Sequence, residues 1–416
     1  MDELVYLIQA PPFWLKTPPL ALAYLENYLK NKGLMVKVRD LNIELFKLAK
    51  IAVKDWLTLN LEFEEGLFSF AEQNFTQLLE SLYAQIKNYE LIGFSLFKRN
   101  VPFSFSLANK IKEIFPEKNI IFGGPEVLFL DWQKNLAPDY SWVIGEGEIP
   151  LYKTISGGHK GIYRFEEIDN LDNLPFLDFN ALNLKLYSPV IPLISSRGCP
   201  NTCNFCTERK LYQRFRFHSP EYIVEEIKCL VQKYKTNNFI FCDSLINYNN
   251  KWLQDFCSLV IKNKLNIKWE AQMRVDKKFS RELGALMKKS GCYNLFVGLE
   301  SGSNNMLRAM NKGFNLETAL DFFKSLNKAK LQFEISLIFG YPGETEGNFR
   351  DSLDFIRQNK KLIPKIAQAN PFVDYLGDHE NKYPLNTVKS RIRKFLRILE
   401  LEKIRYTKSF INNLIY

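Results

Sequence analysis

Three cysteines that lie close together are the residues of this sequence that point most directly to chemistry. Cys199, Cys203 and Cys206 have the spacing Cys-x3-Cys-x2-Cys, in the stretch SSRGCPNTCNFCTERKLYQRFRF that begins at Ser195. Thiolates grouped this closely in one loop can hold a metal centre. A structural zinc site needs four protein ligands, and the nearest candidate for the fourth is His218. An iron–sulfur cube held by three cysteines leaves one iron open, and that iron can be a site of chemistry.

The segment before the cysteines indicates where they lie in a fold. The run PVIPLISSRG, residues 189–198, has the apolar character of a buried strand and is expected to turn sharply at Gly198. The cysteines would then follow the carboxyl end of a strand, where barrel-type α/β enzymes keep their chemistry. This spacing and setting resemble the radical S-adenosylmethionine (SAM) superfamily. The resemblance implies a [4Fe-4S] cluster on these cysteines and SAM at the open iron, with a zinc site or an incidental cysteine group as the alternatives.

The composition of the chain sets broad limits. It has 416 residues, of which 46% are hydrophobic, enough for two or three domains with large cores. An odd number of cysteines, with none before Cys199, predicts a reducing cytoplasmic location instead of a disulfide framework. The acidic start MDELVYLIQA does not read as a secretory signal, and no apolar run has the length of a membrane span. The net charge of +10 is scattered, which favours a lysine-rich surface over a nucleic-acid partner.

Strand and helix patterns alternate through the first third of the chain. Apolar runs predict strands in ELVYLIQAPP, MVKVRDLN, ELIGFSLF, NIIFGGPE and SWVIGEGE, with helices over residues 18–33 and 104–115 and a poorly patterned helical stretch over 44–88. This pattern predicts a doubly wound, Rossmann-like parallel sheet. Such sheets bind ligands outside the carboxyl ends of their strands. The residues expected at that rim are Ser95, Gly123, Gly124, Gly145 and Gly147.

These rim residues and the strand order resemble the cobalamin-binding domain of cobalamin-dependent radical SAM enzymes, over about residues 1–150. The resemblance implies that cobalamin binds at the rim. The alternatives are that the glycines only make tight turns, or that the domain is degenerate and binds nothing. The family's cobalt-ligating motif Asp-x-His-x-x-Gly is missing, because residues 11–17 read PPFWLKT and no histidine precedes His159. The lower face of cobalt is therefore expected to meet Trp14, Leu15 or water.

The second half of the chain alternates helix and strand after a polar linker. We expect a Rossmann-like cobalamin-binding-type domain over 1–165, the linker over 166–189, a partial (β/α)6 radical SAM barrel over 190–360 and a helical extension over 361–416. Five strands are expected by Gly340, and one more around residues 366–372. The tail is predicted to be an amphipathic helix that packs on the barrel through Ile392, Phe395, Leu396, Leu399 and Leu401.

Polar residues at the expected strand ends are candidates for binding SAM. By the resemblance, Asp243 stands where the family contacts the amino group, and Glu300 stands where it contacts the ribose or methionyl group, followed by Ser301 and Ser303. Arg274 could meet the methionyl carboxylate. Residues 338–344, with Ile338 and Gly340, resemble the segment that lies along adenine. The alternative is that these charged residues cap helices or pair on the surface. His218 and Cys229, Cys242, Cys257 and Cys292 are expected to be structural rather than ligands, the four cysteines as core thiols.

The resemblance implies reductive cleavage of SAM to a 5′-deoxyadenosyl radical, which abstracts hydrogen from an unactivated carbon. With methylcobalamin, the expected activity is a cobalamin-dependent methyltransferase. The alternatives are a radical SAM cyclase or rearrangement enzyme and, less favoured, a cobalamin- or cluster-dependent sensor. A tRNA methylthiotransferase would need three further cysteines in the N-terminal domain, which this chain lacks. The expected partners are a small-molecule, lipid or peptide substrate and an external electron donor of the flavodoxin or ferredoxin type.

Overall fold

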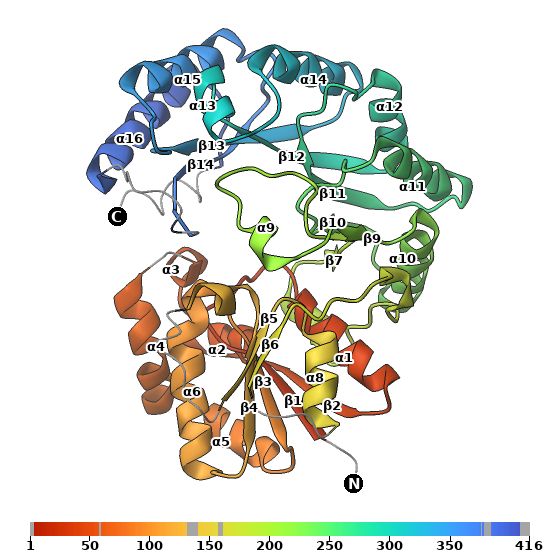
Figure 1. Cartoon of the computed structure of the whole chain (residues 1–416), viewed down its shortest axis with the longest axis vertical. Coiled ribbons are helices and arrows are strands. Elements are labelled where there is room, and N and C mark those ends of the chain that lie inside the picture. The colour runs from red at the N-terminus through yellow and green to blue at the C-terminus, as the bar shows by residue number, and fades with distance from the viewer. Residues whose placement is uncertain are drawn as a thin grey trace. The chain divides into compact units, whose positions relative to one another are not determined.

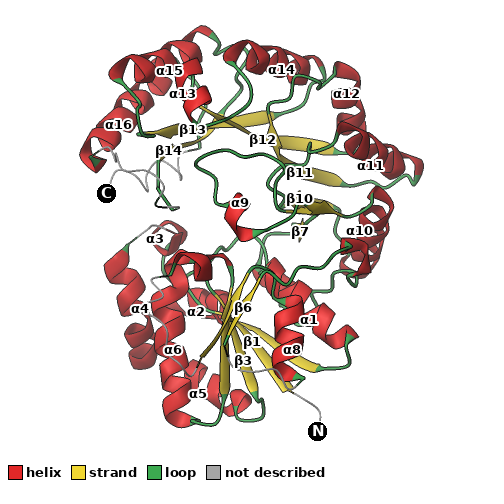
Figure 2. Ribbon diagram, viewed as in Figure 1, coloured by secondary structure: helices red, strands yellow, loops and turns green. Residues whose placement is uncertain are grey.

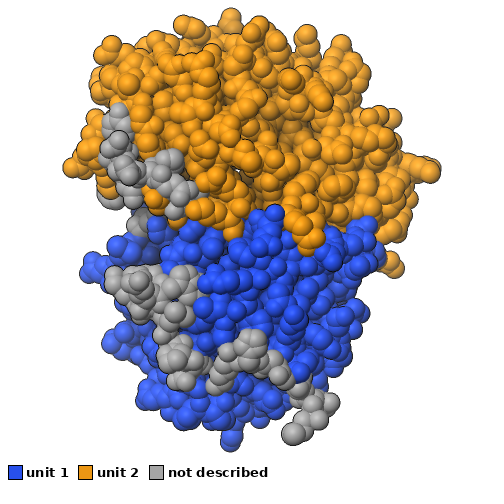
Figure 3. Space-filling view, viewed as in Figure 1, with its two compact units in different colours: residues 1–191, 211–213 blue, residues 192–210, 214–416 orange. Residues whose placement is uncertain are grey.

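A computed structural model describes residues 4–57, 60–130, 140–156, 161–375, 377 and 384–407. The chain divides into two compact units (Figure 3). Unit 1 contains residues 1–191 and 211–213, and unit 2 contains residues 192–210 and 214–416. The segment expected as a linker, residues 166–189, is therefore grouped with unit 1. Among the described residues, no helix combines the length and the apolar character that crossing a membrane requires.

Unit 1 is built on a six-stranded parallel sheet in the order β2-β1-β3-β4-β5-β6. The chain order changes direction between β1 and β3, which makes this position the switch point of a doubly wound sheet. The last strand, β6, was not expected from the sequence. The strands are β1 (Leu4–Gln9), β2 (Met35–Asp40), β3 (Leu91–Ser95), β4 (Asn119–Gly123), β5 (Tyr140–Ile144) and β6 (Ile162–Arg164).

Helices cover both faces of this sheet (Figure 1). On one face, α2, α4, α5 and α6 bury their apolar sides against alternate strand residues such as Tyr6, Ile92 and Phe122. On the other face lie α1 and α8. The doubly wound arrangement predicted from the sequence is thus confirmed. The helices are α1 (Leu20–Asn31), α2 (Leu41–Ala49), α3 (Val53–Leu57), α4 (Leu61–Asn74), α5 (Thr76–Ile86), α6 (Val101–Ile114) and α8 (Glu148–Ile155).

Unit 2 contains a second six-stranded parallel sheet, in the order β14-β13-β12-β11-β10-β7. It is the partial barrel that the sequence predicts, and Figure 2 shows its strands as a curved layer with helices along one side. The strands are β7 (Ile191–Leu193), β10 (Asn238–Phe241), β11 (Lys268–Arg274), β12 (Cys292–Glu300), β13 (Phe333–Phe339) and β14 (Ile366–Pro371). Because β14 belongs to this sheet, the sheet extends past the boundary expected at residue 360.

Five helices of unit 2 begin where the sequence provides a capping side chain. The side chain before each of five helices accepts a hydrogen bond from a backbone N–H of the first turn, which would otherwise lack a partner. These capping residues are Ser219, Asn249, Ser280, Asn315 and Thr345. The helices are α9 (Glu208–Leu211), α10 (Pro220–Tyr234), α11 (Asn250–Lys262), α12 (Arg281–Lys289), α13 (Asn304–Ala309), α14 (Leu316–Lys328), α15 (Glu346–Gln358) and α16 (Leu385–Leu401).

The segment after α16 returns to the outer edge of the sheet. Ile366 N donates to Arg405 O (2.9 Å), and Thr407 N donates to Ile366 O (3.0 Å). These two bonds form a parallel bridge between Ile366 and Tyr406, beside β14. Residues 405–407 therefore occupy part of the edge that β14 would otherwise present.

Two expectations about individual side chains are wrong. Leu401 is 68% exposed, because it lies at the end of α16 and off the face that buries Ile392, Phe395, Leu396 and Leu399. Cys229 and Cys242 are exposed, whereas Cys257 and Cys292 are buried as expected of core thiols. In β10 the buried side chains alternate. Phe241 packs on Phe256 of α11, so Cys242, the next residue, lies on the face of the sheet opposite α11.

Candidate functional site

Residues 198–207 form the cysteine loop. Backbone hydrogen bonds between the segments on either side of it fix the base of the loop. Gly198 has φ 82°, a left-handed conformation that favours glycine and makes the expected turn. Just before it, β8 (Ser196–Arg197) pairs in antiparallel fashion with β9 (Arg216–Phe217). His218 N also donates to Ser195 O (2.8 Å). The segments before the loop and after it, at residues 195–197 and 216–218, are therefore held side by side.

The middle of the cysteine loop is attached to the end of α13. Asn204 donates from its backbone N to Met310 O (3.1 Å) and from its side chain to Ala309 O (2.9 Å). In return, Asn311 Nδ2 donates to Thr202 O (2.9 Å). The loop is held at its middle as well as at its base, so the positions of the cysteines between these points are restricted.

The three cysteines are free thiols, with Cys203 buried and the other two half-buried. Burial raises the pKa of Cys206 to about 11. In the described part of the chain, no three His, Cys, Asp or Glu side chains converge as a single metal ion requires. In an iron–sulfur cube each thiolate binds a different iron, so the three sulfurs need not converge. His218 is buried with its ring stacked on Tyr222 at 4.2 Å, in agreement with a structural role.

Two cationic side chains lie beside the cysteine loop. Arg274 Nη1 is 3.0 Å from Cys203 Sγ and donates to it, and its guanidinium lies 5.6 Å from the centre of the Phe314 ring. The buried Lys312 Nζ lies 5.5 Å from the ring of Phe205 and 5.6 Å from that of Phe314. Positive charge favours thiolates over thiols and favours an anionic centre. The residues present therefore fit a [4Fe-4S] cluster, and Arg274 contacts a predicted cluster ligand.

Asp243 follows β10 and is almost completely buried. Its carboxylate accepts from Ser195 N (3.0 Å), from Ser195 Oγ (2.7 Å) and from Ser196 Oγ (2.5 Å). Burial is the main reason why its pKa is raised to about 6, against the opposing effect of these hydrogen bonds. The structure thus uses Asp243, the residue expected to contact the amino group of SAM, to fix the base of the cysteine loop.

Glu300 ends β12 with φ 69°, an uncommon conformation for a residue with a side chain. Its two carboxylate oxygens contact Lys312 Nζ (3.3 Å) and Ser336 Oγ (3.0 Å). Through Lys312, which also faces Phe205, Glu300 is connected to the cysteine loop. No sequence pattern points to Lys312, which is a single lysine in the turn between α13 and α14.

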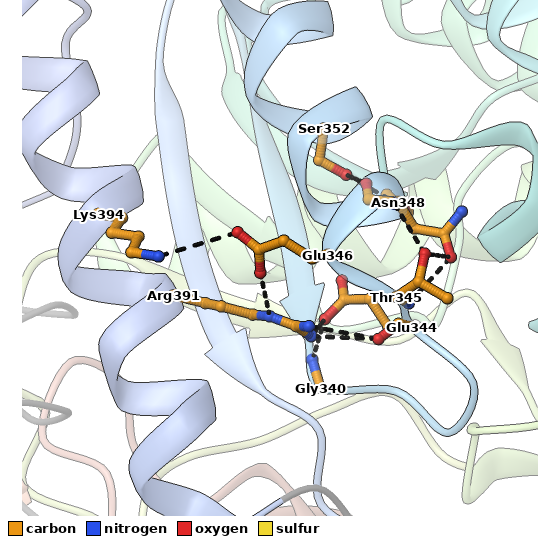
Figure 4. Close-up of polar contacts among 9 residues, drawn as sticks. Gly340, Glu344, Thr345, Glu346, Asn348, Ser352, Arg391 and Lys394 are labelled. Carbon is orange, nitrogen blue, oxygen red and sulfur yellow. Dashed lines mark hydrogen bonds and ion pairs between the residues drawn. The ribbon is translucent and has the colours of Figure 1, made fainter.

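The other predicted SAM contacts fall into two groups. Ser301 Oγ lies 3.3 Å from Ser352 Oγ, and Ser303 Oγ donates to Asp351, so both hydroxyl groups bond to α15. Neither hydroxyl group is among the hydrogen-bond partners given above for Arg274, Glu300 and Lys312. Ile338, in contrast, packs in one apolar cluster with Phe205 of the cysteine loop. Gly340 has φ 79° and donates its N–H to Glu344 Oε2 (2.8 Å), as Figure 4 shows.

The predicted rim of unit 1 is shaped mainly by close packing. A Cβ added at Gly124 (φ 96°) would lie 2.5 Å from Leu96 O, and one at Gly147 would lie 2.9 Å from the Leu25 side chain. At Gly145 (φ 100°) it would lie 3.3 Å from the Phe165 ring. Close contacts within the protein therefore account for glycine at these three positions, in line with the alternative that the glycines serve only tight turns. Gly123, which pairs with Ser95, is different: an added Cβ would meet the nearest atom at 3.7 Å, an ordinary contact.

Two buried asparagines hold the loop that follows β1, and sequence reasoning missed both. Asn42 Oδ1 accepts from Phe13 N (2.8 Å), and Asn100 Nδ2 donates to Ala10 O (3.2 Å) and Ser95 O (3.0 Å). This loop lies at the switch point of the sheet. It presents Trp14, which is 50% exposed, while Leu15 packs against the core. Residues 11–17, which include no histidine, therefore form a fixed loop with an accessible indole.

Comparisons with known proteins agree with this geometry. Residues 193–356 match the model of the radical SAM superfamily. An uncharacterized methyltransferase of Pyrococcus horikoshii is 27% identical over 349 residues, which are 77% of this chain and 75% of the relative. Bacteriochlorophyllide d C-12(1)-methyltransferase of Chlorobaculum tepidum is 28% identical over 52% of this chain and 49% of its own length. An anaerobic magnesium-protoporphyrin IX monomethyl ester cyclase of Cereibacter sphaeroides is 29% identical over 45% of this chain and 31% of the cyclase.

Solved structures show the same fold. The cobalamin-dependent SAM radical enzyme OxsB, with aqua-cobalamin and SAM bound, superposes with a TM-score of 0.69 at 17% identity. That match covers 99% of this chain and 56% of OxsB. The radical SAM methyltransferase TsrM of Kitasatospora setae, with cobalamin and a [4Fe-4S] cluster, gives a TM-score of 0.68 at 15% identity, over 89% of this chain and 72% of TsrM. This chain thus spans about half the length of OxsB and of the Chlorobaculum tepidum relative.

Proposed function

We propose that this chain, which is a radical SAM enzyme, is a cobalamin-dependent methyltransferase that acts on an unactivated carbon of a small-molecule, lipid or peptide substrate. The observation that carries the proposal is the cysteine loop, fixed at its base and its middle and flanked by Arg274 and Lys312. Such a loop holds three thiolates in place for a cluster and offers positive charge beside them.

When bound, the cluster and SAM supply a 5′-deoxyadenosyl radical that removes hydrogen from the substrate, and cobalamin supplies the methyl group. Cys199, Cys203 and Cys206 would hold the cluster, while Arg274 offsets its negative charge. Asp243 keeps the base of the loop in place through Ser195 and Ser196. Glu300 and the segment from Ile338 to Gly340 would bind SAM at the carboxyl edge of β12 and β13.

The rim of unit 1 supports the cobalamin part of the proposal. The switch point between β1 and β3 is the usual ligand site of a doubly wound sheet. The loop at this point presents Trp14 and contains no histidine, which fits a cobalamin whose cobalt has no histidine ligand. Cobalamin held there would supply the methyl group, and Trp14 would present an apolar ring to it instead of a ligand to the metal. The rim residues Ser95 and Gly123 would border the cofactor.

A second candidate function is radical cyclisation or rearrangement, with or without cobalamin. It is favoured by the similarity to the magnesium-protoporphyrin cyclase, which lies in the same range of identity as the methyltransferases. Methylthiotransfer is disfavoured, because no cysteine of this sequence precedes Cys199 and could ligate a second cluster in unit 1. For either candidate we infer an external electron donor of the flavodoxin or ferredoxin type in a reducing cytoplasm.

The test is to purify the enzyme without oxygen from cobalamin-supplied cells and to measure iron, sulfide, cobalt and the absorption spectrum. SAM labelled in its methyl group is then added with a reductant and a substrate extract. We expect a [4Fe-4S] spectrum, bound cobalamin, formation of 5′-deoxyadenosine and transfer of the label to a product. Full occupancy by zinc would refute the radical mechanism. SAM cleavage by a protein that takes up no hydroxocobalamin would favour the cyclisation candidate.

A further inference from the structure

A buried ion pair joins helix α16 to the turn that follows β13 (Figure 4). Arg391 Nη1 lies 2.6 Å from Glu344 Oε2, and both side chains are almost completely buried. The same guanidinium donates to the backbone oxygen of Glu344 from Nη1 (3.3 Å) and Nη2 (3.4 Å). One residue of α16 thus binds both the side chain and the main chain of Glu344.

Glu344 in turn binds the backbone just after the end of β13. Its Oε2 accepts from Gly340 N (2.8 Å) as well as from Arg391, so one carboxylate oxygen bridges the turn and the helix. A buried carboxylate without a cationic partner is costly, and so is a buried guanidinium without an anion. The geometry of residues 340–344 therefore depends on the presence of Arg391.

Apolar contacts add a second constraint at the same place. A Cβ added at Gly340 would lie 2.5 Å from Cγ2 of Val388, one turn before Arg391 in α16. The ring of Phe339 lies 5.2 Å from that of Phe395, one turn after Arg391. Arg391 also lies 5.6 Å from the ring of Phe349 in α15. Helix α16 thus packs on the end of β13 and on the turn after it over about two of its own turns.

We propose that Arg391 is a positioning residue for SAM: through Glu344 it sets the conformation of residues 340–344, which bind the adenosyl part of the cofactor. The inference rests on the proposed function, which places SAM along this turn. It assigns to the C-terminal helix a part in cofactor affinity in addition to its packing on the sheet. The turn is preorganised before SAM arrives, so less binding free energy is spent on ordering it.

The test compares variants of the anaerobically reconstituted full-length enzyme. Arg391→Lys keeps the charge but loses the second nitrogen that contacts the Glu344 main chain. Glu344→Gln keeps an acceptor for Gly340 N but loses the ion pair. Lys394→Ala is the matched control, because Lys394 is an exposed residue of the same helix that lies 3.8 Å from the half-exposed Glu346. Arg391→Ala is added if it folds.

We expect the KM for SAM in 5′-deoxyadenosine formation to rise about tenfold or more in Arg391→Lys and Glu344→Gln. The kcat should change much less, and iron content and cluster absorption should stay as in the wild type. Hydrogen exchange should increase in residues 340–345 and not in β10 or β11. The Lys394→Ala enzyme should match the wild type in each measurement.

Two results would overturn the inference, and they differ from each other. If the wild type cleaves SAM and both conservative variants bind it with unchanged affinity, Arg391 does not position the cofactor turn, and the proposed function stands. If the variants lose the cluster together with SAM binding, Arg391 only supports the fold. A wild type that assembles no cluster and cleaves no SAM would instead refute the proposed function itself.

Discussion

The carboxyl edges of the two parallel sheets are built in different ways. In unit 2, charged side chains at the strand ends contact one another or the cysteine loop, as Arg274 does with Cys203 and Glu300 with Lys312. In unit 1, the edge is formed by glycines and by main chain that the buried Asn42 and Asn100 hold. The edge in unit 2 offers charged side chains to a ligand, whereas the edge in unit 1 offers mainly main chain in a fixed conformation. We infer that unit 2 performs the radical chemistry. Unit 1 would hold cobalamin, a cofactor that carries its own reactive group.

The largest expected effect tests the carboxyl edge of the sheet in unit 2. Replacing Cys199, Cys203 or Cys206 by Ala should abolish both the iron–sulfur absorption and SAM cleavage, because each cysteine would supply a thiolate to a different iron. Iron analysis and 5′-deoxyadenosine formation measure the two losses. Cys229→Ala is the matched control, since Cys229 is exposed on α10 and should be dispensable. A single Ala variant that retains the cluster spectrum would show that unit 2 holds its metal in another way.

The next effect tests the carboxyl edge of the sheet in unit 1. Gly123→Leu should prevent cobalamin uptake without disturbing the cluster, because there is space for its Cβ and the added bulk would occupy the rim. Gly124 is less suitable, since a side chain there would strike the Leu96 backbone. Gly66→Leu is the control: it lies on α4 with no atom within 4 Å of an added Cβ. Cobalt content and the cobalamin spectrum provide the measurement, and normal uptake by Gly123→Leu would contradict this placement of the cofactor.

A smaller effect is expected at Glu300. The Gln variant keeps an acceptor for Ser336 but leaves the buried Lys312 without its carboxylate. A lost charged partner costs about 1–3 kcal/mol, so SAM affinity should fall roughly five- to hundredfold with the cluster intact. Equilibrium dialysis with SAM measures it, and Glu317→Gln, an exposed change on α14, serves as the control. Equal affinities in the two variants would mean that Glu300 acts in the fold alone.

The smallest effect concerns pH and unit 1. Burial raises the pKa of Asp40 from 3.8 to about 7, although its carboxylate accepts from Ile43 N and is contacted by Tyr187. The folded state therefore binds this proton more tightly than the unfolded state, and its contribution to stability falls as pH rises from about 4 to 7, by at most about 1.4 kcal/mol per pH unit. Asp40→Asn should lose this dependence. Hydrogen exchange of β2 and α2 at pH 6 and 8, corrected for intrinsic rates, tests it, and parallel curves for both proteins would rule it out.

What the sequence could predict follows the same division. The cysteine loop can be identified because its three cysteines lie close together in the chain, and α10 because Ser219 and Pro220 mark its start. The contacts that complete the site join distant residues, such as Asp243 with Ser195 and Arg391 with Glu344, 48 and 47 residues apart. No local pattern encodes such pairs, since they depend on which strands become neighbours. The rim glycines were recognised, but their packing against Leu96 and Leu25 could not be foreseen.

The bridge between Ile366 and Tyr406 has a consequence for the behaviour of the chain among its own copies. A partial barrel has two free edges, and exposed backbone N–H and C=O groups at an edge can pair with a strand of another molecule. At one edge the strand β7 is only three residues long, which offers little template for such pairing. At the other, residues 405–407 already occupy the hydrogen-bonding groups of Ile366. The segment after α16 thus leaves fewer backbone groups of β14 open to pairing with another molecule, and it does so without closing the barrel.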